Sequence, residues 1–183
     1  MAARLAMDKP DLIKSLVIVD SNTLSYDDPS VPREFYEKIE RSLPSSPTRE
    51  SVCLEAIANS YSTSHITEDF IDEMYAIALQ PKILDAKQKM KSNLGVVFRE
   101  KLNALRIKAL EDIRLGKLRK PTLILWGLND PSAPYVLAND LYRLISSCND
   151  RTELHFFNQA GHYSFREKAN DFNAVLKSFV ESL

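Results

Sequence analysis

Three short apolar runs predict buried strands, and a long stretch between the first two runs predicts helices. The runs cover residues 16–20, 121–127 and 152–157, and each has the length of a strand rather than of a helix. Residues 25–110 instead carry apolar positions at helical spacing. We therefore expect an α/β fold in which parallel strands with flanking helices are interrupted by a helical region.

The middle of the chain has the start and stop signals of several helices. Pro32 stands near one expected start and Pro44 follows the corresponding end, while Thr67 heads a capping sequence. Helices are expected at residues 31–43, 48–60, 67–79 and, in one or two pieces, 82–119. The chain thus divides into residues 1–24 (core helix and strand), 25–110 (a helical cap or lid) and 111–183 (the rest of the core).

Composition excludes several classes of function. The 183 residues carry 24 Lys and Arg against 25 Asp and Glu, without a basic stripe, so nucleic acid is not an expected partner. Neither a signal-peptide core nor an apolar run that could cross a bilayer is present, so no membrane association is expected. Cys53 and Cys148 lack metal-ligand spacing and are expected to be free thiols in the cytoplasm.

A polar residue that could take part in catalysis follows each of the last two strands. Asp130 comes just after the first of these runs, and His162 follows Ala160-Gly161 after the second. Because parallel strands end at the same edge of a sheet, the two side chains can meet and form the acid and base of a catalytic triad. The alternatives are a turn-forming or helix-capping role for Asp130 and a structural loop role for His162.

A nucleophile for this pair is not evident in the sequence. A serine on a sharp strand-to-helix turn requires Gly-x-Ser-x-Gly, and the four glycines of the chain never stand at that spacing. Ser21 is the only serine at the end of an expected strand, but no glycine supports a sharp turn there. His65 and His155 lack the context of His162 and predict no metal site, so neither a metal nor a cofactor is expected.

These features resemble the C-terminal part of the α/β-hydrolase family. Residues 1–20 are similar to the small-residue helix, Lys-Pro-Asp step and apolar strand that follow the nucleophile elbow in that family, and Asp130-Pro-Ser-Ala-Pro134 is similar to its acid turn. The resemblance implies a triad made by Asp130, His162 and a serine that precedes Met1. The nucleophile would then lie outside this chain, and the 183 residues alone are expected to be inactive.

Within this family, the helical insert and residues 167–179 resemble the meta-cleavage-product hydrolases, which break a carbon-carbon bond in 2-hydroxy-6-oxo-dienoates. Tyr163 stands where that group usually has Trp, and is a candidate for substrate binding. Glu73 stands where that group offers an Arg to the substrate carboxylate. The resemblance implies a small organic carbonyl substrate, with a carboxylic ester as the alternative.

A non-catalytic role is a further alternative. If the strand at residues 16–20 lies at the edge of the sheet, its unpaired backbone groups favour a partner. That partner would be a complementary N-terminal fragment, a second copy of the chain in a homodimer, or another protein that the surface binds.

Overall fold

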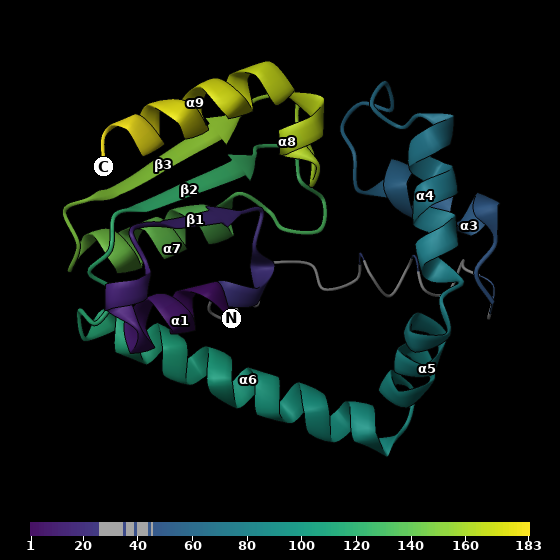
Figure 1. Ribbon diagram of the computed structural model, residues 1–183, viewed down its shortest axis with the longest axis horizontal. Coiled ribbons are helices and arrows are strands. Elements are labelled where there is room, and N and C mark those ends of the chain that lie inside the picture. Colours follow the sequence, from purple (N-terminus) through teal and green to yellow (C-terminus); the bar gives the residue numbers. More distant parts are fainter. Residues whose placement is uncertain (26–34, 36–38, 40–43, 45) are drawn as a thin grey trace.

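The computed structural model describes residues 1–25, 35, 39, 44 and 46–183. Its sheet has three parallel strands, β1 (Leu16–Val19), β2 (Thr122–Gly127) and β3 (Thr152–Phe157), in the order β1-β2-β3 (Figure 1). All three strands were predicted from their apolar runs, and the α/β class is confirmed. The helix expected at residues 31–43 lies outside the described residues.

The central strand β2 is buried along its whole length, and its side chains alternate between the two faces of the sheet. Ile124 and Trp126 pack on one face in a cluster with residues of β1 and with α1 (Ala2–Asp8), the end of α6 (Asn93–Arg114) and α7 (Val136–Ser146). Leu123 and Leu125 pack on the opposite face with Phe172 and Phe179 of α9 (Ala169–Glu181). A continuous apolar run is what a strand buried on both faces requires.

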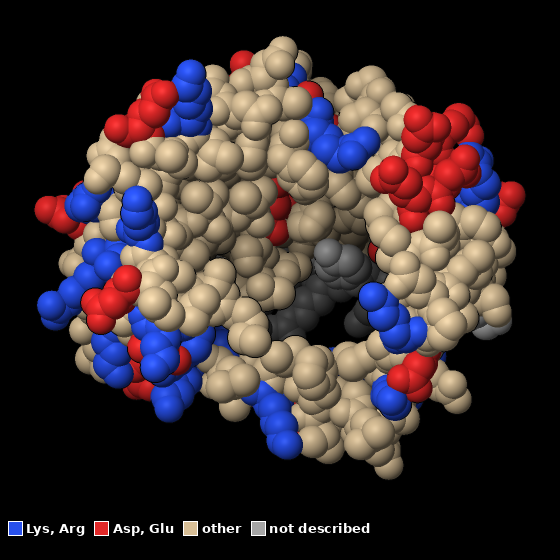
Figure 2. Space-filling model, viewed as in Figure 1, with Lys and Arg blue, Asp and Glu red and all other residues tan. Residues whose placement is uncertain are grey.

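Three outer helices stand apart from the sheet and its covering helices (Figure 1). They are α3 (Arg49–Ala58), α4 (Glu68–Ala78) and α5 (Pro81–Met90). Thr48 and Thr67 cap α3 and α4 by accepting a hydrogen bond from the backbone of the third residue beyond, and Pro81 opens α5. The space-filling view shows a deep hollow between these helices and the core (Figure 2).

The long helix α6 connects the outer helices to the core. Its end is buried at Ala109, Leu110 and Ile113, whereas Leu94 and Leu102 near its start are exposed. It runs through residue 110, where the sequence suggested a domain boundary, so one helix serves both parts. Two 3-10 turns, η1 (Pro10–Leu12) and η2 (Asn22–Leu24), and the single-turn helix α8 (Ser164–Glu167) complete the described elements.

None of the described helices is both long enough and apolar enough to span a bilayer.

Replacement of Ile124 by Ala should destabilise the fold strongly. The side chain is fully buried between the sheet and its covering helices, so its loss leaves a cavity that costs about 2–5 kcal/mol in the free energy of unfolding. Urea denaturation measures this cost. The matched control is Leu94→Ala on the exposed part of α6, which should change the free energy by less than about 1 kcal/mol. Equal effects of the two substitutions would contradict the assigned core.

Candidate active site

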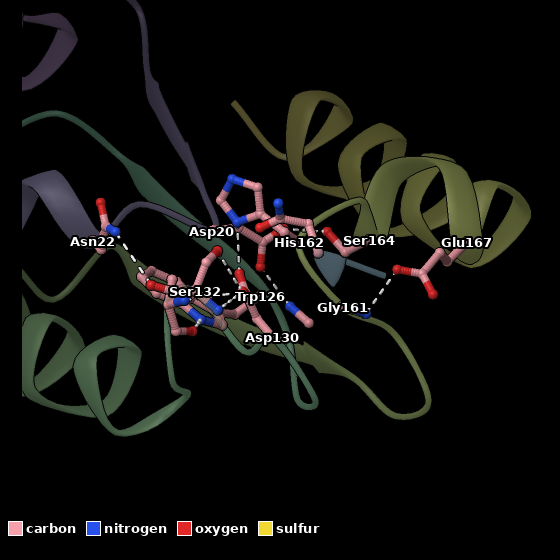
Figure 3. Close-up of polar contacts among 12 residues, drawn as sticks. Asp20, Asn22, Trp126, Asp130, Ser132, Gly161, His162, Ser164 and Glu167 are labelled. Atoms are coloured by element: carbon pink, nitrogen blue, oxygen red, sulfur yellow. Dashed lines mark hydrogen bonds and ion pairs between the residues drawn. The ribbon is translucent and has the colours of Figure 1, made fainter. Parts of the chain in front are cut away.

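The loops that follow the three strands meet at one edge of the sheet. Asp20 directly follows β1, Asp130 lies in the turn after β2, and His162 lies in the loop after β3. Since all three strands are parallel, their carboxyl ends share that edge, and the three side chains come together there (Figure 3). The edge therefore collects two carboxylates and one imidazole from segments that are far apart in sequence.

Asp130 and His162 form a hydrogen bond. His162 Nδ1 lies 2.7 Å from Asp130 Oδ2, and the Asp130 side chain is buried. The other oxygen, Oδ1, accepts from the Ser132 amide and hydroxyl, both at 2.8 Å, and from the Ala133 amide at 2.9 Å. An oxygen that accepts three donors belongs to an ionised carboxylate, so Nδ1 is the protonated nitrogen and donates. Oδ1 of Asp130 thus stabilises the turn, while Oδ2 pairs with His162.

The second nitrogen of His162 is available for chemistry. Nε2 faces away from Asp130 (Figure 3), and within the described part of the chain no residue bonds to it. The side chain as a whole is 32% exposed. The hydrogen bond to Asp130 raises the pKa of His162 above its ordinary value, and the charges of Asp130 and Asp20 act in the same direction against the effect of burial. His162 is therefore held in the tautomer and orientation of a general base.

Asp20 is a second buried carboxylate at this edge, and sequence reasoning did not identify it. Its Oδ1 accepts from the Gly127 amide and its Oδ2 from the Ser164 hydroxyl, each at 2.6 Å. Burial raises its pKa to about 7, although both hydrogen bonds oppose this shift, and the charge of Asp130 raises the pKa further. The sequence signal that could have identified Asp20 is its position directly after an apolar run. Asp130 and His162 likewise lie in the turns that follow apolar runs.

The loops after β2 and β3 are in direct backbone contact. The Asn129 amide donates to the Ala160 carbonyl at 2.9 Å, and Asn129 Oδ1 accepts from the Gln159 amide at 2.9 Å. A β-carbon on Gly127 would lie 2.1 Å from the Gly161 carbonyl oxygen, so no side chain fits there. Glycine at this position lets the two loops approach closely enough for Asp130 and His162 to bond.

The described serines near the pair have other partners. Ser132 and Ser164 donate their hydroxyl protons to Asp130 and Asp20. Ser21, the candidate from sequence, contacts Thr23 at 3.1 Å between hydroxyl oxygens and makes no bond to His162. Among the described residues, therefore, no serine hydroxyl is hydrogen-bonded to Nε2 of His162.

A serine and histidine also meet between α3 and α4, but their protons are arranged wrongly for catalysis. Ser60 Oγ lies 2.9 Å from His65 Nε2 and donates its own proton to the Ala56 carbonyl at 2.8 Å. His65 Nδ1 accepts from Arg166 Nε, so Nε2 carries the proton and donates to Ser60. In this arrangement His65 is a hydrogen-bond donor to Ser60 and cannot accept its proton.

Tyr163 lies beside His162 in an aromatic group. Its ring centroid is 6.1 Å from that of His162, 5.4 Å from His65 and 6.1 Å from Phe70. The third histidine, His155, stands in β3 and packs on Phe157, away from this group. No group of three His, Cys, Asp or Glu side chains suited to a metal ion occurs in the described ranges.

No protein-family model matches the chain. The 2-hydroxy-6-oxononadienedioate/2-hydroxy-6-oxononatrienedioate hydrolase 1 of Pseudomonas putida is 37% identical to it over 67 residues, which are 37% of this chain and 22% of that protein. A protein of Pseudomonas sp. with the same enzyme name is 26% identical over 180 residues, 98% of this chain and 58% of its own length.

The meta-cleavage product hydrolase CumD from Pseudomonas fluorescens superimposes with a TM-score of 0.71 at 20% sequence identity, over 99% of this chain and 60% of that one. The chain therefore has the α/β-hydrolase fold, as the sequence predicted, and the comparisons support the suspected family. It spans about 60% of the length of the relatives that it matches from end to end.

The pairing of His162 with Asp130 can be tested by NMR titration of the histidines. We expect His162 to have a pKa above its ordinary value and the Asp130→Asn variant to lower that pKa, because the hydrogen bond to the negative partner is lost. His65, whose pKa is lowered by burial, is the internal control and should not respond. A His162 pKa below 6.5, or one that Asp130→Asn leaves unchanged, would contradict the pairing.

Asp20 predicts a pH dependence of stability. Its pKa is about 7 in the fold against 3.8 in the unfolded chain, so between these pH values the native state holds a proton that the unfolded state has lost. The free energy of unfolding should fall across this window as the pH rises, by as much as roughly 4 kcal/mol. Asp20→Asn keeps the shape of the side chain and removes the titration. In denaturation experiments from pH 4 to pH 7.5, the free energy of unfolding of the variant should rise relative to that of the parent protein as the pH increases. A difference that stays constant with pH would refute the assignment.

Proposed function

We propose that Asp130 and His162 are the acid and the base of a serine-type α/β-hydrolase that acts on a small organic carbonyl compound. The observation that carries the proposal is the 2.7 Å bond from His162 Nδ1 to the buried Asp130 carboxylate, on a histidine whose side chain is partly exposed. The preferred reaction is hydrolysis of a carbon-carbon bond in a 2-hydroxy-6-oxo-dienoate, because the relatives that match bear names of that class. Hydrolysis of a carboxylic ester is the alternative, since the same pair serves both reactions.

In this mechanism His162 transfers a proton, and Asp130 stabilises the protonated form of His162. Nε2 of His162 takes the proton of a serine hydroxyl as that serine attacks the substrate carbonyl, and later returns it to the leaving group. Asp130 stabilises the imidazolium that exists between these steps. Its buried position and its three further donors keep the carboxylate fixed, so little reorganisation is needed when the charge develops. The serine and the oxyanion-binding amides would come from a segment outside these 183 residues.

The outer helices are proposed to act as the lid of this site. They stand across a hollow from the core (Figures 1 and 2), and a lid that closes over such a hollow would exclude water from the pair. Tyr163 is proposed to contact the substrate, because its ring lies next to His162 and extends the aromatic group toward α4. No metal or cofactor enters the proposed reaction.

The outer edge of β1 is the proposed docking site for the segment that carries the nucleophile. The Leu16 amide donates to the Pro121 carbonyl just before β2, and the Asp20 amide donates to the Leu125 carbonyl of β2. By the alternation of a parallel ladder, the Val17 and Val19 amides therefore face away from β2. β1 pairs with β2 alone among the described strands. This edge lines a groove of about 810 Å³ together with α1 and α6. An extended segment, rather than a second copy of the chain, matches such a groove.

Without a nucleophile, the chain would serve only as a binding module, which is the second candidate function. The open edge of β1 and its groove favour this reading. In either case Cys53 and Cys148, which form no disulfide, are consistent with the proposed cytoplasmic location.

Turnover assays distinguish these functions. The 183-residue chain alone should hydrolyse neither a 2-hydroxy-6-oxo-dienoate nor a p-nitrophenyl ester. Protein purified from its native source should hydrolyse the dienoate in preference, and His162→Ala introduced there should lower kcat by roughly six orders of magnitude, the scale of the loss when a triad histidine is removed.

Exposed Glu153→Gln on β3 is the control and should leave kcat unchanged. Turnover by the isolated chain that requires His162 but resists a serine-directed inhibitor would show a different nucleophile and refute the proposal. Native protein without activity on either substrate, but in a stable complex, would favour the binding module.

A further inference from the structure

Two consecutive backbone amides of the loop that carries His162 donate hydrogen bonds to other elements. One of these bonds reaches the outer helices. The His162 amide donates to the Asn59 carbonyl, at the end of α3, over 2.8 Å. The preceding amide, that of Gly161, donates to Glu167 Oε1 over 2.8 Å. A β-carbon on Gly161 would lie 2.6 Å from the Asn59 carbonyl oxygen, so the backbone after α3 rests directly on this loop. The position of His162 thus depends on how the outer helices sit.

The carboxylate of Glu167 connects the loop that carries His162 to the segment between α3 and α4. While Oε1 holds the Gly161 amide, Oε2 accepts from the Tyr61 amide at 2.9 Å and from the Ser62 amide at 2.7 Å. Hydrogen bonds to an ionised acceptor are stronger than neutral ones, and here three of them converge on one group. One oxygen therefore binds the catalytic loop and the other binds the connection between α3 and α4.

Arg166, the neighbour of Glu167, holds the same connection at a second place. Its Nη2 donates to the His65 carbonyl at 3.1 Å, and its guanidinium carbon lies 4.2 Å from the centroid of the Phe70 ring. Both residues belong to α8, which begins only two residues after His162. The short helix is therefore a rigid link between the histidine and the outer helices.

We propose that Glu167 is a positioning residue that couples the seating of the outer helices to the orientation of His162 against Asp130. This rests on the proposed function, in which that orientation makes His162 the base. Glu167 acts through the backbone of Gly161 and bonds to neither ring nitrogen of His162. With the carboxylate withdrawn, the Gly161, Tyr61 and Ser62 amides lose their common acceptor, and the loop can turn so that Nδ1 leaves Asp130.

The test is NMR of the 183-residue chain, which needs no substrate. Glu167→Asp keeps the charge but is one methylene shorter and cannot reach both sides, whereas Glu167→Gln keeps the length and loses the charge and one acceptor. Gly161→Ala leaves Glu167 intact and pushes the Asn59 carbonyl away with its methyl group. Exposed Glu153→Gln is the control. The readouts are the His162 Nδ1 proton bonded to Asp130 and the exchange rates of the Gly161, Tyr61 and Ser62 amides.

We expect all three variants at the junction, but not the control, to speed exchange of these amides by roughly ten- to a hundredfold and to weaken or remove the Nδ1 proton signal. Faster amide exchange with an unchanged Nδ1 signal would overturn the coupling and leave the hydrolase proposal standing. Unchanged exchange in Glu167→Asp and Glu167→Gln would overturn the bridge itself. If the coupling holds but the native protein lacks hydrolase activity, only the proposed function fails.

Discussion

The parallel pairing of β2 with both of its neighbours is the constraint on which the site depends. It places the ends of β1, β2 and β3 at one edge, so that Asp20, Asp130 and His162 meet although 142 positions separate the first from the last. Close backbone contact at Gly127 then brings the loops after β2 and β3 within hydrogen-bonding distance. The sheet therefore brings Asp130 and His162 together, and the backbone contacts between the two loops hold them there.

Two carboxylates share this edge but have different environments. Asp130 has three donors on one oxygen and the imidazole on the other, so both of its oxygens have partners. Asp20 has two donors in a buried position, and its pKa is raised to about 7. The same edge thus holds one carboxylate that bonds to His162 and one proton-sensitive carboxyl group that ties β1 to the segment after His162 through Ser164.

The sequence predicted the strands, most of the longer described helices and the proximity of Asp130 and His162, because each depends on a local pattern. Asp130 and His162 each lie in a turn that follows an apolar run. Thr48 and Thr67 each precede a segment with apolar residues at helical spacing. The sequence did not reveal the roles of Asp20 and Glu167. Their partners, Gly127 and the amides after α3, lie more than a hundred residues away, and only the fold shows that these backbone groups need an acceptor. Burial of a carboxylate likewise has no local signature.

Labelling with a fluorophosphonate, followed by peptide mass spectrometry of the protein from its native source, tests the central claim most directly. This reagent modifies a serine only when a paired histidine activates it. The account predicts one labelled serine that lies outside these 183 residues, and no labelling when His162 is replaced by Ala. Labelling of a serine within the chain, or labelling that persists without His162, would contradict the assignment of Asp130 and His162 as the acid and base of a serine hydrolase.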